Sequence, residues 1–152
     1  FLYFIGSKRE FKKMEEREVL RVMELSVIPA EVCPLHAPLG LRLRYQLLEP
    51  VPAATWELVY EADFTNKRQV VPLCSTNPVD LEPGEHTFEH HVDSVNTGGV
   101  KEKYLLQVGV LKLTLKGGNR TDNVASINMV TQVSKDPSSG VLLRNVMNPL
   151  EQ

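Results

Sequence analysis

Residues 39–47 have the sequence LGLRLRYQL, and this stretch decides the fold class. Leucines or a tyrosine stand at positions 39, 41, 43, 45 and 47, while Arg42, Arg44 and Gln46 stand between them. Successive side chains of a β-strand point to opposite faces, so this alternation predicts a strand with one buried and one solvated face. Such half-buried strands are typical of antiparallel sheets, because parallel sheets are usually covered on both faces.

Further strands follow the same period of two. The pattern places Trp56, Leu58 and Tyr60 on one face of a strand, with Glu57 and Glu61 solvated on the other. It also predicts a weaker strand over residues 69–73, a strand with His86, Phe88 and His90 on one face, a long strand over 100–116 and a return strand over 124–133. Pro72 places its strand at a sheet edge or near a strand end. Gly117-Gly118-Asn119 is typical of a hairpin turn.

About seven strands, no long helix and 10 prolines predict an all-β fold, an immunoglobulin-like antiparallel β-sandwich. We expect the sandwich over residues 19–136 and a C-terminal tail docked on it over 137–152. Residues 8–18 are charged helix formers, so residues 1–18 are expected to form a short N-terminal helix or linker.

The composition limits the function classes. The 152 residues correspond to one domain, and a content of 42% hydrophobic and 24% charged residues is that of a globular protein. There are 17 basic and 19 acidic residues, giving a net charge of −2. Because nucleic-acid-binding domains usually carry a basic excess that neutralises phosphates, we expect no nucleic-acid partner.

The first residues allow two interpretations. Residues 1–6, FLYFIG, are apolar and are followed by Lys8, Arg9, Lys12 and Lys13. An apolar run followed by cations is how a membrane helix ends on the cytoplasmic side, although a complete span needs about 20 residues. The alternative is a docked N-terminus followed by a solvated basic stretch. The expected location is intracellular, in the nucleus or on the cytoplasmic face of a membrane.

No enzyme motif is present. The chain has no nucleophile elbow, phosphate-binding loop, dinucleotide-binding glycine pattern or paired-histidine zinc motif, so we expect a protein that is not an enzyme and binds no cofactor. The two cysteines could pair or stay reduced. A zinc site is the less favoured alternative to ordinary core and loop roles, and its ligands would be Cys33, His36, Cys74 and one of His86, His90 and His91.

Residues 56–60, WELVY, resemble the W-[KE]-hydrophobic-hydrophobic-Y strand of the anti-silencing-function family of histone chaperones. The resemblance continues in register. Leu73 falls on a family leucine, residues 84–88, GEHTF, fall on the family's G-x-H-x-F, and Asp93 and Asn96 fall on its A-D-x-P-N turn. The C-terminal LLRNVMNP of residues 142–149 also resembles a family segment, L-x-R-N…N-P, so the resemblance covers roughly residues 19–149.

The resemblance implies an elongated immunoglobulin-like sandwich whose framework residues are Trp56, Tyr60, Gly84, His86 and Phe88. Family members bind the core histone dimer, and a second partner groove lies beside acidic residues just before the tryptophan. In this chain that stretch is the uncharged VPAA of residues 51–54.

The family binds histones with an exposed apolar strand, an acidic residue after the W-x-x-x-Y strand and an arginine on the hairpin's return strand. These positions map near Gly109, Val70 and Ser126, whose residue types differ from those of the family. The binding residues that the resemblance implies are therefore Val70, Val108, Val110, Ser126, Asp93 and Asn96.

The sequence predicts a non-enzymatic protein–protein interaction module that resembles histone chaperones but lacks their contact residue types. Three alternatives stay open. The chain could be the cytosolic domain of a membrane or ciliary assembly, a core histone chaperone, or a sandwich that carries a lipid between its sheets.

Overall fold

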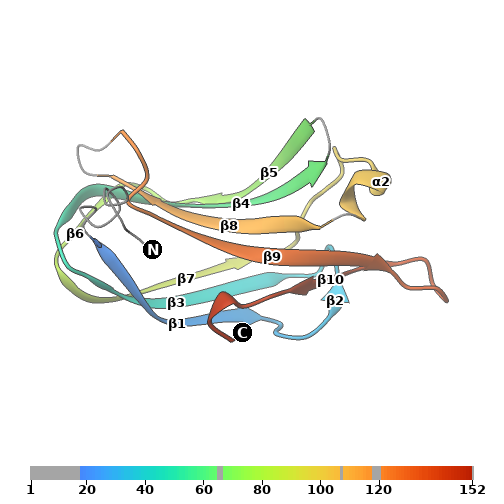
Figure 1. Cartoon of the computed structure of the whole chain (residues 1–152), viewed down its shortest axis with the longest axis horizontal. Helices are drawn as coiled ribbons and strands as arrows, with labels where there is room; N and C mark the ends of the chain where they lie inside the picture. Colours follow the sequence, from blue (N-terminus) through green and yellow to red (C-terminus); the bar gives the residue numbers. More distant parts are fainter. Residues whose placement is uncertain (1–17, 65–66, 107, 118–120, 152) are drawn as a thin grey trace, which may run out of the picture.

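The structure, a computed structural model, describes residues 18–64, 67–106, 108–117 and 121–151. Two antiparallel sheets pack face to face, as Figure 1 shows, which confirms the predicted all-β sandwich. The N-terminal helix or linker predicted for residues 1–18 lies, except for its last residue, outside the described residues.

One sheet has three strands in the order β1-β3-β7. The other has seven strands, with β2, β10, β9, β8, β4 and β5 in spatial order and the short β6 paired to β4. The strand bounds are β1 Leu20–Ile28, β2 Cys33–Pro34, β3 Leu39–Leu47, β4 Val51–Phe64, β5 Lys67–Ser75, β6 Val79–Leu81, β7 Gly84–Val92, β8 Gly109–Lys116, β9 Ala125–Lys135 and β10 Leu142–Val146. A helical turn, α2 (Glu102–Leu105), and a 3-10 turn at Pro149–Glu151 complete the described elements.

The core lies between the sheets and is built from the alternating strands. The inward side chains of β3, from Leu39 to Leu47, are at most 2% exposed. They face Leu111, Leu113 and Leu115 of β8, which are equally buried. Burial on this scale provides the main driving force for folding, because each fully buried leucine contributes about 2 kcal/mol.

Two expected strands differ in extent. Of the strand predicted over residues 100–116, only residues 109–116 form a strand, β8, because residues 102–105 form α2. Glu, Lys and Leu are good helix formers, which favours this turn. Leu105 packs inward from the turn and is only 3% exposed. Lys135 Nζ lies 2.9 Å from Glu102 Oε2 and links β9 to α2. The longest strand is instead β4, with 14 residues.

The periodicity of the sequence did not predict two of the longer strands, β1 and β10. In β1 the pairing with β3 shifts between Val22 and Glu24, so one extra residue interrupts the alternation that marks a strand. The predicted C-terminal tail contributes β10, whose Arg144 pairs with Val133 of β9. The expected boundary at residue 136 therefore cuts through the seven-stranded sheet. Pro72 does lie on an edge strand, since β5 pairs only with β4 among the described strands.

Candidate interaction face on the seven-stranded sheet

Three valines and a glutamate form one row across four neighbouring strands of the seven-stranded sheet. Val70 of β5 pairs with Glu61 of β4, Glu61 pairs with Val110 of β8, and Val110 pairs with Val130 of β9. Directly opposed residues project to the same face of a sheet. The partners Glu61 and Val110 alternate with buried neighbours, so this face is the outer one. We call Val70, Val110 and Val130 the valine row.

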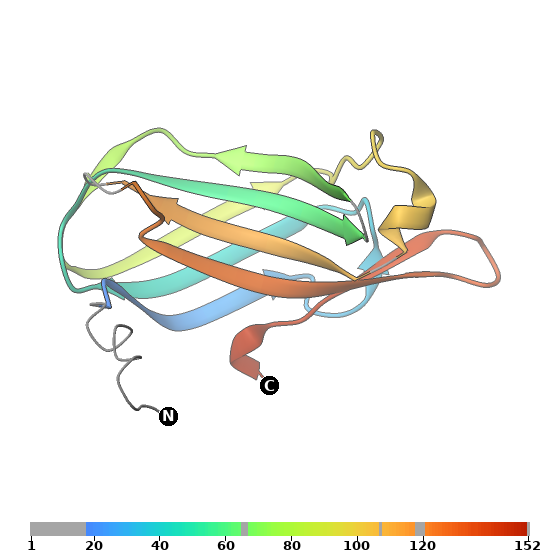
Figure 2. The same cartoon turned by 45° about the horizontal axis from the view of Figure 1, so that its top comes forward.

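The valine row is accessible to a partner. Val70 is 49% exposed and Val130 is 39% exposed, while Val110 is half-buried between them. Val108 is 54% exposed and stands two residues before Val110, just ahead of β8. The exposed valines therefore extend from the middle of the sheet toward the end next to α2. Figure 2 shows the backbone of this sheet from above.

The same outer face carries charges of both signs, and they are paired. Lys112 Nζ lies 3.6 Å from Glu61 Oε2, and Lys116 Nζ lies 3.1 Å from Glu57 Oε1. The side chain of Glu61 is only 13% exposed, so the expectation that it is solvated is wrong. Val70 and Val110 on the neighbouring strands and the aliphatic part of Lys112 lie around this side chain and shield it from solvent. The two ion pairs leave these four side chains with no net charge.

The face is curved. Figure 1 shows β4 and β5 bending away from the three-stranded sheet toward the end next to α2, so the outer face is concave along these strands. Strand twist and the register shift between Leu58 and Val59 in the β4–β5 pair accompany this bend. A concave sheet face can enclose a rod-shaped or extended element better than a flat one.

Most of the predicted binding residues gather on this face. Val70, Val108 and Val110 lie together, and Ser126 of β9 is exposed opposite Thr114 of β8 on the same face. Asp93 and Asn96 do not join them. Asp93 follows β7 of the other sheet, with its Oδ1 3.4 Å from His91 Nε2, and Asn96 Oδ1 accepts a hydrogen bond from the Gly98 N–H at 3.0 Å. Asn96 thus stabilises a local turn.

The predicted framework residues lie in or beside the core. Trp56 and Phe88 are buried, with ring centroids 5.1 Å apart, and Tyr45 meets Trp56 edge-on at 5.4 Å. His86 stacks on Tyr45 at 5.5 Å, and its Nε2 lies 2.6 Å from the Glu82 carbonyl oxygen. These rings line an open cavity of about 220 Å³ between β7 and β6.

Gly84, the other framework residue, begins β7 with a φ of +129°. This backbone conformation favours glycine, since residues with an L side chain rarely adopt it, although a Cβ at position 84 would have no neighbouring atom within 4 Å. The turn before β7 therefore depends on this residue, as the Pro83-Gly84 pair predicts.

The alternative zinc site does not form among the described residues. Cys33 belongs to β2 and Cys74 to β5, which are the two opposite edges of the seven-stranded sheet. His36 Nε2 instead lies 2.7 Å from Thr97 Oγ1. In the described ranges no group of three or more His, Cys, Asp or Glu side chains is placed to hold a metal ion. Both cysteines are free thiols, and burial raises the pKa of Cys74.

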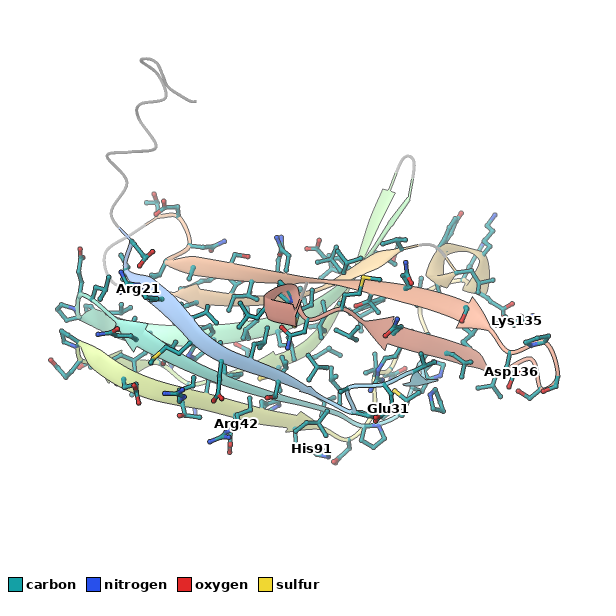
Figure 3. All side chains as sticks on the ribbon, turned by 60° about the horizontal axis from the view of Figure 1, so that its bottom comes forward. Arg21, Glu31, Arg42, His91, Lys135 and Asp136 are labelled. Carbon is teal, nitrogen blue, oxygen red and sulfur yellow. The ribbon has the colours of Figure 1, made fainter. Side chains whose placement is uncertain are left out.

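The outer face of the three-stranded sheet differs from the valine row, because it is lined by ion pairs. Arg44 Nε lies 3.2 Å from Glu24 Oε1, and Arg42 Nε lies 2.8 Å from Glu89 Oε2. Figure 3 shows Arg42 and His91 at this outer surface. The pairs are solvent-exposed, so water screens them and they contribute little to the stability of the fold.

A buried arginine was not predicted as a functional or structural residue. Arg144 of β10 is 4% exposed, and its Nη1 donates to the carbonyl oxygens of Leu35 at 2.7 Å and Ala37 at 2.9 Å. Its Nη2 donates to the Pro38 carbonyl oxygen at 2.8 Å. Burial lowers the pKa of Arg144. The side chain thereby clamps the segment between β2 and β3 onto β10, and only the L-x-R-N resemblance marked it in the sequence.

No helix in the described part of the chain has the length and apolar character needed to cross a membrane. Comparisons of the sequence with protein-family models and with curated proteins give no match. The sandwich and its concave outer face are the features from which a function follows.

Proposed function

We propose that this domain is a non-enzymatic protein–protein interaction module that holds its partner on the concave outer face of the seven-stranded sheet. The valine row is the observation that carries the proposal. Three exposed or half-buried valines stand in one row over three strands, with paired charges beside them. Protein interfaces commonly combine an apolar centre with a polar rim.

The register matters more than the exposure of any one valine. Single exposed apolar residues are normal on protein surfaces and need no partner. The valine row differs because strand pairing brings residues 70, 110 and 130 into one line across the sheet, with Val110 beside Val130 and Glu61 between Val110 and Val70, although they are far apart in sequence. Burying the exposed half of a valine contributes about 1 kcal/mol. Several such contacts together give a useful centre for an interface.

The resemblance to histone chaperones supports a protein partner and names one candidate, the core histone dimer. The charges on this face neither favour nor repel a basic partner strongly, because Glu57 and Glu61 are each paired with a lysine. The partner's charge is therefore a question for the experiment, and purified core histones are included in it by name.

Site-specific photo-crosslinking tests the proposal. A photoreactive amino acid replaces Val130, which is 39% exposed on the proposed face, and in a second protein it replaces Ile28, which is 59% exposed on the three-stranded sheet. Both proteins are irradiated in extract of the source cells and, separately, with purified core histones. Crosslinked proteins are identified by mass spectrometry.

We expect a defined set of crosslinked proteins from position 130 and not from position 28. Val130→Glu should abolish co-purification of that set, because it places a charge in the apolar centre, while Ile28→Glu should leave it unchanged. A partner captured equally from both positions, or retained by Val130→Glu, would contradict the proposal. Core histones among the proteins captured only from position 130 would identify the specific partner.

A further inference from the structure

The hydroxyl group of Tyr60 lacks a protein partner. Tyr60 points inward from β4 and is 2% exposed, and its hydroxyl oxygen is buried without a hydrogen-bond partner among the described residues. Burial raises the pKa of this side chain, so the hydroxyl stays protonated at neutral pH. Buried polar groups nearly always have a partner, either protein or ordered water. We therefore expect a hydrogen-bond partner for the Tyr60 hydroxyl.

Tyr60 lines a small cavity inside the sandwich. The cavity has a volume of about 10 Å³. One water molecule needs about that much space. Its apolar lining comes from residues such as Leu35, Val95 and Leu111, and its polar lining comes from Tyr60, Thr131 and Arg144.

The polar lining offers complementary hydrogen-bonding groups. The Arg144 guanidinium has five N–H groups, and its bonds to Leu35, Ala37 and Pro38 use three of them. Thr131 Oγ1 donates to the Met129 carbonyl oxygen at 3.2 Å, which leaves its lone pairs as acceptors. Buried waters typically make two to four hydrogen bonds, and Tyr60, Thr131 and Arg144 together supply both donors and acceptors.

We propose that a single buried water molecule occupies this cavity and joins the Tyr60 hydroxyl to the Arg144 guanidinium. The water would connect β4, whose Glu61 stands between Val70 and Val110 on the outer face, to β10, whose Arg144 holds the segment between β2 and β3. The size of the cavity favours water over a halide ion, which is larger. The three carbonyl oxygens around Arg144 also disfavour an anion. This proposal does not depend on the proposed interaction function.

Two measurements test the buried water. A high-resolution crystal structure of the unaltered protein should show a water within hydrogen-bonding distance of both Tyr60 Oη and Arg144. Thermal unfolding of Tyr60→Phe should then show a Tm lowered by about 3 °C, because the water loses one partner. Tyr45→Phe is the matched control, since Tyr45 is also 2% exposed but its hydroxyl is hydrogen-bonded to Trp56.

The presence and the absence of the buried water predict changes of opposite sign in the Tm of Tyr60→Phe. With the water present, Tyr60→Phe should lower the Tm as Tyr45→Phe does. With a hydroxyl that has no partner at all, Tyr60→Phe should raise the Tm, because it removes an unsatisfied buried group. A raised Tm, or a crystal structure without density between Tyr60 and Arg144, overturns the proposal.

Discussion

The hydroxyl end of Tyr60 occupies the space that a side chain at Gly109 would need. An ideal Cβ at position 109 would lie 2.7 Å from Tyr60 Cζ and 2.8 Å from the Glu61 carbonyl oxygen, in addition to contacting the Tyr60 hydroxyl. Position 109 therefore faces the core, and its neighbours Val108 and Val110 take the outer face. The apolar side chains that are accessible next to position 109 are therefore those of Val108 and Val110.

Gly109→Ala should destabilise the fold. The added methyl group meets the Tyr60 ring and the backbone of β4, which cannot both move away, and overpacking of this kind costs about 1–3 kcal/mol. Urea unfolding measures the free energy of unfolding. Gly99→Ala is the control, because a Cβ there has no atom within 4 Å, and it should be close to neutral. Equal stability of the two variants would show that Tyr60 does not fill this space.

Arg144→Lys should be strongly destabilising despite the retained charge. A lysine ammonium cannot span the three carbonyl oxygens that the guanidinium reaches, so at least two are left without their donor. We expect a loss of about 3 kcal/mol in the free energy of unfolding, measured with urea. Arg42→Lys, at an exposed pair with Glu89, should cost less than about 1 kcal/mol. Similar losses in both variants would argue against the clamp.

Asp136 should make the fold less stable in acid. Its carboxylate accepts hydrogen bonds from the Ser138 N–H and hydroxyl, both at 3.0 Å, and these bonds hold its pKa below 3.8. Because the folded-state pKa is depressed, its stabilising contribution is present above the unfolded pKa and is lost as the pH falls through the folded pKa. Figure 3 shows Asp136 next to Lys135 at the end of β9.

The Asp136 effect can be measured by thermal unfolding of Asp136→Asn across a pH series. The variant should have a lower Tm than the unaltered protein at neutral pH, and the difference should shrink as the pH falls below about 4. Glu31→Gln, which removes the charge of an exposed carboxyl between β1 and β2, is measured alongside as the control. A Tm difference that is constant with pH would mean that the carboxylate charge is not what stabilises the turn.

The cysteines should behave as separate thiols. Cys33 and Cys74 lie on opposite edge strands of one sheet, so mild oxidation of the folded protein should not join them. Burial raises the pKa of Cys74, so its alkylation should be slow at neutral pH and should speed up in urea. Mass spectrometry after timed alkylation follows both residues. A Cys33–Cys74 disulfide in the folded chain would contradict the strand order.

The periodic stretches were predictable because a β-strand records its own two faces in its sequence. The alternation in residues 39–47 identifies the buried face of β3, and that in residues 111–115 identifies the buried face of β8. The same reasoning failed where the local pattern was broken or ambiguous. The extra residue in β1 breaks the alternation by which a strand is recognised, so β1 was not predicted. Residues 102–105 form a helical turn, although the segment around them alternates well enough to predict a strand.

The all-β class and the inward faces of β3, β4 and β8 could therefore be predicted from the sequence, which also limited Pro72 to a sheet edge or a strand end. These properties depend on neighbours one or two residues away. The three-dimensional packing was needed to place Val70, Val110 and Val130 in one row, Tyr60 in the space beside Gly109, and Arg144 against three distant carbonyl oxygens. Strand register and side-chain burial depend on contacts between residues far apart in the chain, and no local pattern records them.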